Sequence, residues 1–389
     1  MQDPPTRNAA QYLLEQGWHV TILQRDQRRA TGAPIHGDCR LVEALRTLGG
    51  GRATRIAEIA AFAIKLNYLC RRLQPDALVG VMLHAYGLIN AHVQRKARVT
   101  VCSILDIPVP GASGKLNEPI FSRGMRRLRS VDVIWASDKY KGRDIRKLAS
   151  LDKDPIICHN CPKTSYITGD LWPRNPWLRL ELQRRLGHNM GEEMCILLRS
   201  GALGEHGGIE ETLSAIREVK DVVFVLAGQI SKDYQQRLES YASRLGVERR
   251  FTIFKAPSDE IWNLCLRGAD IGHMIHFRPG DGYHQQAYDL NSCLSNNRLF
   301  QYMAAGLPIL VNDDPRLQDI ARQVPCFEPI RQERALEDLR GKISGLSRLP
   351  NRRIDLGTVG RRAHEMTFHW EHQFAPVYDA LTAKLGHVK

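Results

Sequence analysis

The sequence predicts an α/β protein of two domains, each built around a doubly wound parallel sheet. Its 389 residues are enough for two domains of ordinary size. A hydrophobic content of 43% with 25% charged residues is typical of a globular chain. Short apolar runs alternate with segments of helical periodicity, and this alternation starts afresh near Met194. Strands that alternate with helices at such spacing form a parallel sheet covered on both faces.

Residues 1–165 supply the first predicted domain. A helix over 3–17 carries Leu13 and Leu14 on its apolar face and ends at Gly17. Glycines interrupt segment 32–51, so its sequence predicts neither a helix nor a strand. The other expected helices cover 52–73, 88–96 and 116–130, with a further helix capped by Ser137, and the expected strands cover 18–23, 76–83, 99–105, 131–136 and 155–158.

Residues 166–365 supply the second predicted domain, and a last helix within 366–389 is expected to cross back to the first. A long loop over 276–294 separates two of its strands. The expected strands cover 194–199, 221–226, 251–254, 270–275, 309–311 and a short stretch near Cys326, and the expected helices cover 209–219, 231–245, 259–267 and 335–346, with one more from Pro315.

The prediction for the second domain depends most on one stretch, residues 294–311. Ser295 is a good N-cap, and apolar residues follow it at helical spacing: Leu299, Phe300, Tyr302 and Met303. Gly306 tolerates the positive φ that closes a helix, and Pro308 cannot continue it. The N-terminus of such a helix presents backbone N–H groups and a partial positive charge, which suit a diphosphate.

This stretch resembles the donor-site signature of retaining sugar-nucleotide glycosyltransferases of family 4, which have the GT-B fold. Their signature reads Ser-Pro-Asn-Lys-Leu-Phe-Glu-Tyr-Met-Ala-Ala-Gly before a proline and a strand. The resemblance implies two Rossmann-like domains that face each other across a cleft, with a nucleoside-diphosphate sugar at the start of this helix. The chain departs from the signature at three positions, where Asn296, Arg298 and Gln301 replace Pro, Lys and Glu.

The resemblance also implies which residues contact the sugar. The family's ribose-binding Glu corresponds to Gln301, and a first Glu, eight residues earlier, corresponds to Cys293. Gln301 can still hydrogen-bond ribose hydroxyls. Alternatively, the Asp-Gly-Tyr segment 281–283 is a displaced form of the family's Glu-Gly-Phe element, and Asp281 contacts the sugar. The catalytic candidates are therefore Gln301, Asp281 and His84, although a single strand-end histidine such as His84 is more often structural.

Loops at the carboxyl edge of the second sheet are expected to form the donor pocket, because ligands of open α/β sheets bind beyond this edge. In the family the first loop supplies an Arg and a Lys to the diphosphate, but these positions fall on Ala202 and Gly207. His206, Arg199 and Arg298 are the candidates to replace them. The expected donor-binding residues are Arg199, Gly201, Gly204, His206, Gly228, Lys255, Cys293, Ser295, Asn296, Asn297, Arg298 and Gln301.

These features predict a hexosyltransferase that moves a sugar from a nucleoside-diphosphate sugar to a polysaccharide, glycan or lipid-linked acceptor, with retention. A helix N-terminus stabilises the leaving diphosphate without a metal, so we expect no cofactor and no metal ion. The alternative is a catalytically degenerate GT-B protein that binds a sugar nucleotide or a partner as a scaffold, which the neutral residues at 293 and 301 favour. A sugar-nucleotide epimerase needs acidic catalytic residues for which the sequence offers no candidate.

The start of the chain departs from the family pattern. In the family, a strand and a glycine-rich loop precede the helix that corresponds to residues 3–17. That strand is central in a doubly wound sheet, and two neighbouring strands lose a partner without it. No such strand precedes the helix in this sequence. We therefore expect either a truncated start or a rearranged first domain.

The net charge of +13 is not uniformly distributed, and residues 115–147 hold ten Lys and Arg against four Asp and Glu. A basic surface fits anionic lipid, nucleic acid or solubility alone. The sequence carries no zinc-finger spacing or RNA-binding signature, so we expect no nucleic-acid partner. The resemblance favours peripheral contact with an anionic inner membrane surface, where lipid-linked acceptors reside.

The cellular location is expected to be cytoplasmic. No apolar run reaches the ~18 residues of a membrane span, and no signal peptide is visible. Nine scattered cysteines argue for reduced thiols. Cys158 and Cys161 have the spacing of a redox dithiol or half a zinc site, but no second pair follows and the segment resembles the family's hinge. His273 and His276 are interpreted as structural or pocket-lining.

Overall fold

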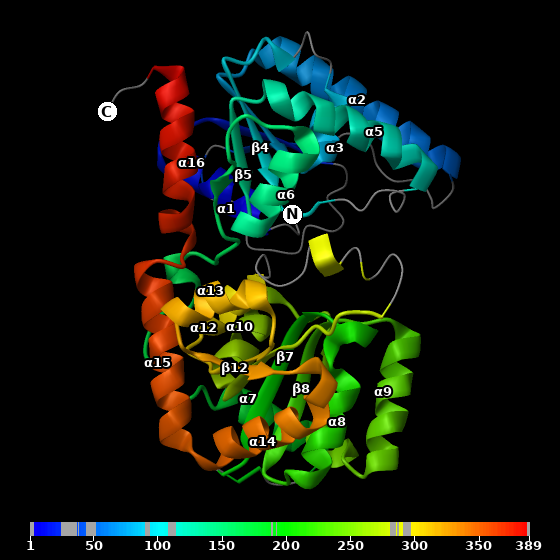
Figure 1. Ribbon diagram of the computed structural model, residues 1–389, viewed down its shortest axis with the longest axis vertical. Helices are drawn as coiled ribbons and strands as arrows, with labels where there is room; N and C mark the ends of the chain where they lie inside the picture. The colour runs from blue at the N-terminus through cyan, green and yellow to red at the C-terminus, as the bar shows by residue number, and fades with distance from the viewer. Residues whose placement is uncertain are drawn as a thin grey trace. The chain divides into compact units, whose positions relative to one another are not determined.

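A computed structural model of the protein describes residues 4–24, 37, 39–43, 52–89, 94–107, 114–187, 190–191, 193–280, 285, 288–290 and 297–386. The chain divides into two compact units, each with parallel strands and covering helices (Figure 1). Unit 1 comprises Met1–Asn160, Asp281–Ser295 and Trp370–Lys389. Unit 2 comprises Cys161–Gly280 and Asn296–His369.

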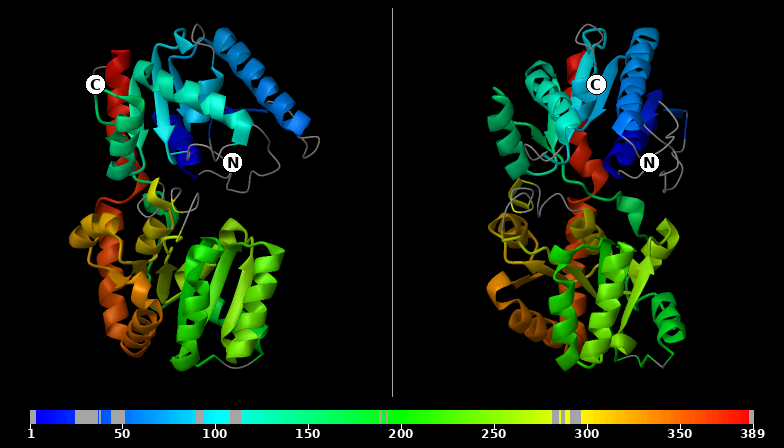
Figure 2. Two further views of the ribbon diagram at one scale, coloured as in Figure 1. Left: turned by 45° about the vertical axis from the view of Figure 1, so that its right-hand side comes forward. Right: turned by 90° about the vertical axis from the view of Figure 1, so that its right-hand side faces the viewer.

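Unit 2 contains a six-stranded sheet in which every pair of neighbours is parallel. Its order is β12-β11-β10-β7-β8-β9, and β7, β8 and β9 lie side by side in Figure 2. The chain runs outward from β7 to β9 and then returns to the other side of β7, so the order reverses between β7 and β10. The strands are β7 (Cys195–Ala202), β8 (Val222–Gln229), β9 (Phe251–Lys255), β10 (Ile271–Met274), β11 (Ile309–Asn312) and β12 (Phe327–Ile330).

Helices pack on both faces of this sheet. On one face, α8 (Ile209–Glu218), α9 (Lys232–Leu245) and α14 (Ala335–Arg348) share a buried apolar cluster with β7 and β8. The cluster contains no residue of α7 (Trp177–Leu186), α10 (Asp259–Gly268) or α12 (Asn297–Ala304), which pack on β9, β7 and β10 respectively. The remaining helices of unit 2 are α13 (Pro315–Gln323) and α15 (Pro350–Met366), and α15 packs against α12.

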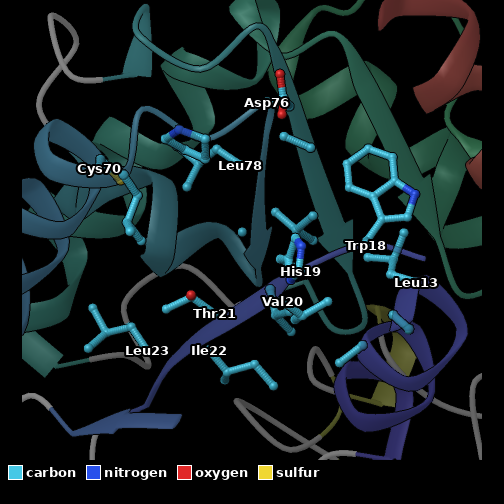
Figure 3. A pocket seen from close by; sticks show the side chains of 18 of the residues that line it. Leu13, Trp18, His19, Val20, Thr21, Ile22, Leu23, Cys70, Asp76 and Leu78 are labelled. Atoms are coloured by element: carbon cyan, nitrogen blue, oxygen red, sulfur yellow. The ribbon is translucent and has the colours of Figure 1, made fainter. Parts of the chain in front are cut away.

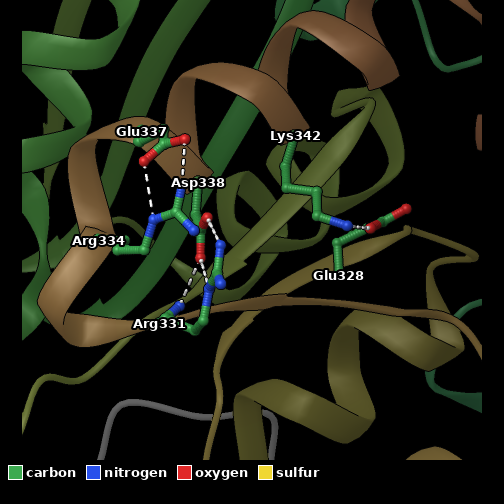
Figure 4. A network of polar contacts seen from close by, with 6 residues as sticks. All are labelled: Glu328, Arg331, Arg334, Glu337, Asp338 and Lys342. Atoms are coloured by element: carbon green, nitrogen blue, oxygen red, sulfur yellow. Dashed lines mark hydrogen bonds and ion pairs between the residues drawn. The ribbon is translucent and has the colours of Figure 1, made fainter.

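Ion pairs fasten the start of α14 to β12 and to the turn between them (Figure 4). Arg331 donates two side-chain hydrogen bonds to Asp338, at 2.6 and 2.8 Å. Lys342 donates to the buried carboxylate of Glu328 at 2.6 Å, and Arg334 pairs with Glu337 one turn away. Because Glu328 lies in β12 and Lys342 in α14, this network connects the edge strand to its covering helix.

The strands of unit 1 form two separate parallel sheets. One has the order β1-β2 and the other the order β3-β4-β5-β6. Among the described residues, no strand pairs with the second edge of β1 or of β3. The strands are β1 (Val20–Gln24), β2 (Cys39–Glu43), β3 (Ala77–Val81), β4 (Val99–Ile104), β5 (Val133–Ala136) and β6 (Ile156–Ile157).

The helices of unit 1 also lie in two layers. On one face, α1 (Pro4–Glu15) and α16 (Trp370–Leu385) share an apolar cluster with β4 and β5, in which Trp135 and Trp370 are buried against Phe374. On the other face, residues of α3 (Leu83–Leu88), α5 (Gly114–Arg127) and α6 (Lys139–Ala149) form a second cluster, against which Leu66 of α2 (Arg52–Leu73) packs. The first and last helices of the chain therefore share one core.

Three expectations for unit 1 are corrected by the structure. The segment 32–51 contains β2, which pairs with β1 along its whole length. A helix begins at Leu83, directly after β3, where the sequence predicted a strand end and a helix only from 88. Asp138 and not Ser137 caps α6, because the Asp138 carboxylate accepts from the backbone N–H of Lys141 at 2.8 Å while the Ser137 hydroxyl donates to the carbonyl of Leu105.

Candidate functional site

Buried polar side chains gather at the carboxyl ends of β7 and β10 in unit 2. This is the point where the strand order reverses, and open parallel sheets bind their ligands beyond the strand ends at such a point. The loop after β7 leads into the N-terminus of α8, and α12 packs on β10. Two helix N-termini therefore start at one edge of the sheet, and both favour a negative charge.

Arg199, near the end of β7, is the buried centre of this constellation and is only 1% exposed. Its Nη1 donates to the carbonyl of Ile275 at 2.6 Å and to Nδ1 of His273 at 3.1 Å. Its Nε is buried without a hydrogen-bond partner among the described residues. The guanidinium also lies against Gly207, where a Cβ would approach Nη2 to 2.6 Å.

His273, in the middle of β10, holds Arg199 in place. Its Nε2 lies 2.8 Å from the hydroxyl of Thr212, and that hydroxyl donates to the carbonyl of Gly208 at 2.6 Å. Because the Thr212 hydroxyl donates its proton to Gly208, it can only accept from His273, whose Nε2 therefore carries the proton. Nδ1 of His273 is then unprotonated and accepts a hydrogen bond from Arg199. Burial, and then the charges of Arg199 and Arg298, lower the pKa of His273 well below 6.5, so the ring is neutral.

Arg298, at the start of α12, is the second cation of the site and is 9% exposed. Its guanidinium lies over Gly201, whose φ is +101° and where a Cβ would meet Nη2 at 2.6 Å. Tyr302, one turn further along α12, fixes the helix to β7: its hydroxyl accepts from the N–H of Ser200 at 2.9 Å and donates to the carbonyl of Leu198 at 3.0 Å. The strand end and the helix are thereby held in register.

Two buried guanidiniums so close together favour an anionic ligand. Burial first, and then the charge of Arg298, lower the pKa of Arg199 to about 9, and burial lowers the pKa of Arg298. Among the described residues, no carboxylate forms an ion pair with Arg199. An uncompensated buried charge is costly, and a bound anion removes much of that cost. The arrangement can therefore bind a phosphate or diphosphate at the ends of β7 and β10.

Glycines bring the loops of this edge close together. Gly228, at the end of β8, pairs with Gly201, and a Cβ on Gly228 would lie 1.7 Å from the carbonyl oxygen of Gly201. By contrast, a Cβ on Gly204 would have no neighbour within 4 Å. Packing against the backbone therefore requires glycine at 228, and the positive φ favours it at 201, whereas position 204 has room for a side chain.

Gln301, a catalytic candidate from the sequence, is 9% exposed and occupies the buried side of α12. Its Nε2 donates to the hydroxyl of Tyr166 at 3.0 Å. Tyr166 lies in a short 3-10 turn, Thr164–Tyr166, at the beginning of unit 2. A glutamate at position 301 would accept a hydrogen bond from this hydroxyl, whereas glutamine donates one to it.

The remaining donor-binding candidates of the described chain lie at the rim of the site or away from it. His206 lies in the loop after β7, and its ring contacts that of His276 with the centroids 6.4 Å apart. Partial burial, and then Arg199 and Arg298, lower the pKa of His276. Asn297 is the first residue of α12, and its buried Oδ1 has no hydrogen-bond partner among the described residues. Lys255 is exposed at the end of β9, two strands away from β7.

Other predicted candidates lie outside the described residues or in unit 1. Asp281, Cys293, Ser295 and Asn296 are outside the described residues. His84 belongs to the first turn of α3 in unit 1, not to the strand end where the sequence placed it. Cys158 is buried, and its burial raises the pKa of the thiol. No group of three metal-ligating side chains occurs in the described ranges.

Sequence reasoning missed three residues that shape the site: Thr212, Tyr302 and Tyr166. Tyr302 was assigned only to an apolar helix face, although its hydroxyl makes hydrogen bonds to β7. Thr212 occupies the first turn of a helix after a glycine pair, and nothing in its local sequence links it to His273. Tyr166 lies 135 residues before Gln301, so only the fold reveals their contact.

The chain is similar along nearly its whole length to solved GT-B structures. Sucrose-phosphate synthase from Thermosynechococcus elongatus matches with a TM-score of 0.72 at 14% identity, covering 97% of this chain and 92% of that one. A glycosyltransferase from Rickettsia africae ESF-5 matches with a TM-score of 0.69 at 12% identity, covering 99% and 95%. Neither a protein-family model nor a curated protein matches the chain.

A third solved structure was determined with a ligand. HepE from Anabaena in complex with UDP-glucose matches with a TM-score of 0.65 at 13% identity, covering 89% of this chain and 86% of that one. At such identities the likeness establishes the fold. The chain therefore has the GT-B fold with two Rossmann-like parallel-sheet domains, which confirms the fold predicted from the sequence.

Proposed function

We propose that this chain is a glycosyltransferase of the hexosyltransferase class. It takes a sugar from a nucleoside-diphosphate sugar and transfers it to a polysaccharide, glycan or lipid-linked acceptor, with retention of configuration as in family 4. The observation that carries the proposal is the buried Arg199–Arg298 site at the reversal point of the unit 2 sheet. The resemblance of residues 294–311 to a donor-site signature supports the same ligand, as does the UDP-glucose bound by HepE.

The site residues suggest how transfer is promoted. Negative charge builds on the diphosphate as it leaves the sugar, and preorganised positive groups lower the energy of that state. Arg298 and the N-terminus of α12 supply this charge beside Gly201, and Arg199 supplies it beside Gly207 in the loop after β7. His273 and Thr212 hold Arg199, so little reorganisation is needed during the reaction. We propose that no metal ion takes part.

The first experiment measures donor binding by thermal shift with UDP-, GDP-, ADP- and dTDP-sugars. A ligand at 100 times its dissociation constant should stabilise the protein by about 2.7 kcal/mol. Arg298→Gln should abolish most of the shift because it removes a cation of the site. Arg249→Gln is the matched control, since Arg249 is exposed in the 3-10 turn Glu248–Arg250 that precedes β9, at the opposite edge of the sheet. A set of donors that gives no shift with the unmodified protein contradicts the proposed site.

The second experiment tests transfer itself. With the donor that binds, we expect release of the nucleoside diphosphate in the presence of an acceptor extract, and an α-linked product from an α-configured donor by NMR. Inversion at the anomeric carbon would contradict retention. Binding without any turnover would contradict the enzyme assignment.

The second candidate function is a scaffold that binds a sugar nucleotide or a partner without catalysis. The observation that favours it is the neutral Gln301, bound to Tyr166 where the family has a carboxylate. Gln301→Glu discriminates the two functions. An enzyme should change its turnover or its donor affinity, whereas a scaffold should keep both donor binding and the absence of turnover.

The basic region 115–147 is proposed to contact an anionic membrane surface. Lys141 is not part of this surface: it is 2% exposed and donates to Asp106 at 2.8 Å. The exposed cations are Arg123, Arg126, Arg129, Lys139, Arg143, Arg146 and Lys147. None of the described helices is long and apolar enough to cross a membrane. Flotation with phosphatidylserine vesicles should be lost on Arg143→Glu with Lys147→Glu, and flotation that does not change would contradict this contact.

A further inference from the structure

The C-terminal end of α12 is held by arginines from two other segments of unit 2. An α-helix leaves its last carbonyl groups without partners inside the helix. Arg361 of α15 donates from Nη1 to the carbonyl of Ala304 at 2.6 Å. Arg174, in the segment before α7, donates to the carbonyls of Ala305 and Gly306 at 2.7 and 2.6 Å. Three consecutive carbonyls at this end therefore accept hydrogen bonds from two guanidiniums.

α15 leaves this end of α12 no room to slide. The two helices pack against each other in unit 2 (Figure 1). A Cβ on Gly357 of α15 would lie 2.1 Å from the carbonyl oxygen of Gly306. Phe368, which follows α15, stacks on Phe300 of α12 with the ring centroids 5.6 Å apart. Polar and apolar contacts thus fix the end of α12 that is remote from the anion site.

The opposite end of α12 carries the anion site. Arg298 lies in its first turn, and the guanidinium fits over Gly201, where a Cβ would meet it at 2.6 Å. With eight residues that each rise about 1.5 Å, α12 is about 12 Å long. A short helix passes a tilt at one end on to the other, and a misplacement of about 1 Å at a reacting site can cost about 100-fold in rate. The place of Arg298 therefore depends on how the carbonyl end is held.

The two guanidiniums also act on the dipole of α12. The carbonyl end of a helix carries about half a negative charge, which opposes an anion at the other end. Arg174 and Arg361 lie on these carbonyls and offset that charge. Burial lowers the pKa of Arg174 to about 10, so the guanidinium is still charged at pH 7. Its charge therefore favours anion binding at the N-terminus of the helix from the opposite end.

We propose that Arg174 and Arg361 are positioning residues of the donor site. By holding the carbonyl end of α12, they set the place of Arg298 and of the helix N-terminus, and thereby the affinity for the diphosphate of the donor. Their role rests on the proposed function, since it requires that the Arg199–Arg298 site binds a diphosphate.

The first test measures the affinity for inorganic pyrophosphate by isothermal titration calorimetry in metal-free buffer. Arg174→Gln and Arg361→Gln should each bind about tenfold more weakly, because they release the carbonyl end of α12. Arg353→Gln is the matched control. Arg353 donates from Nη1 to the carbonyls of Leu346 and Ser347 at 2.6 and 2.8 Å, and so holds the end of α14 in the same way. This variant should keep the affinity of the unmodified protein.

The outcomes separate the positioning role from the donor site itself. Unchanged affinity in Arg174→Gln and Arg361→Gln would overturn the positioning role alone. An equal loss in Arg353→Gln would overturn it too, because it would show a general effect of lost stability. Pyrophosphate that does not bind the unmodified protein would overturn the donor site and the positioning role together. Arg361→Gln removes one carbonyl bond only, so it carries the test if Arg174→Gln does not fold.

Arg174→Lys separates position from charge. Lysine keeps the positive charge, but its compact ammonium does not reproduce the paired N–H donors of a guanidinium. We expect an affinity between those of Arg174→Gln and the unmodified protein. Full affinity in Arg174→Lys would show that charge alone acts, and would overturn positioning.

Hydrogen exchange of the unmodified protein gives a test that needs no substitution. Coupling between two sites is reciprocal, so an anion that binds better to a fixed helix also fixes the helix. With pyrophosphate bound, the amides of Gly306 and Leu307, which close α12, should exchange several-fold more slowly. The amides of Gly246 and Val247 close α9 with the same pattern and are the control. Unchanged exchange at Gly306 and Leu307, or equal slowing at the control amides, would overturn the positioning role.

Discussion

The two units have the same kind of parallel sheet but differ at its centre. In unit 2 the central strands are complete: the first six residues of β7 and seven residues of β8 are buried. In unit 1 the strands β1 and β3, which line a cavity of about 860 Å³ (Figure 3), are only half-buried, since one residue of β3 is buried and none of the described side chains of β1 is. The comparison shows that burial of a strand depends on its neighbours more than on its own sequence.

The largest expected effect concerns a glycine of the complete sheet. Gly228→Ala places a Cβ 1.7 Å from the carbonyl oxygen of Gly201, so the ends of β7 and β8 must move apart. We expect the free energy of unfolding of unit 2 to fall by about 3 kcal/mol. Denaturant unfolding, followed by hydrogen exchange in β7 and β8, measures the change. Gly204→Ala is the control and should change little, and an equal loss for both variants would refute the close approach.

The next effect compares a leucine of an internal strand with a leucine of an edge strand. Leu198 is fully buried in β7, whereas Leu78 is half-buried in β3 and lines the cavity of unit 1. Leu198→Ala should lower the free energy of unfolding by about 3 kcal/mol, and Leu78→Ala by about 1 kcal/mol, since the second side chain already faces a cavity. Both changes are measured by chemical denaturation. Equal losses would mean that the Leu78 side chain does not face a cavity.

A third effect is the pH dependence of unit 2. The pKa of buried His273 is lowered, so the folded state takes up its proton less readily than the unfolded state. Stability is therefore complete above pH 6.5 and falls as the pH drops below 6.5, with a slope of up to about 1.4 kcal/mol per pH unit for this residue. His273→Gln should reduce this slope in denaturation curves between pH 6.5 and 5. The exposed His372→Gln should leave it unchanged, and an unaltered slope in His273→Gln would refute the assignment.

The smallest effect concerns the ion pairs of α14. Hydrogen bonds from Arg331 lower the pKa of Asp338 to about 2. The carboxylate thus contributes stability above pH 3.8 that is lost as the pH falls toward 2. Asp338→Asn should lower the free energy of unfolding at pH 7 by less than about 1 kcal/mol, because Arg331 is partly exposed. Glu337→Gln, on the fully solvated pair, is the control and should have a smaller effect still.

Much of the fold was predictable from the sequence because strands and helices differ in periodicity. Gly306 ends α12 with a φ of +59°, and α13 begins at Pro315, both as the turn chemistry predicts. By contrast, β2 lies in a glycine-punctuated segment without a clear alternation, so only its pairing with β1 identifies it. The helix at Leu83 was missed because apolar residues of a buried short helix and of a strand end look alike.

The candidate site was predictable only in part. The signature helix and the glycine loops pointed to the edge of the sheet at which Arg199 and Arg298 lie, since strand ends can be read from the order of elements. The contact between Arg199 and His273 joins residues 74 positions apart, and their pairing depends on the register of β7 with β10. Such contacts follow from the three-dimensional register, which a single sequence does not contain.

The shared core of α1 and α16 has a consequence for synthesis of the chain. Ala9 and Leu13 pack in one cluster with Trp370, Phe374 and Leu381, so unit 1 needs residues from both ends of the chain. Every residue of unit 2 emerges from the ribosome before α16 does. During translation the later-encoded unit can therefore finish folding first, while β4 and β5 wait with an uncovered apolar face that a chaperone is suited to shield.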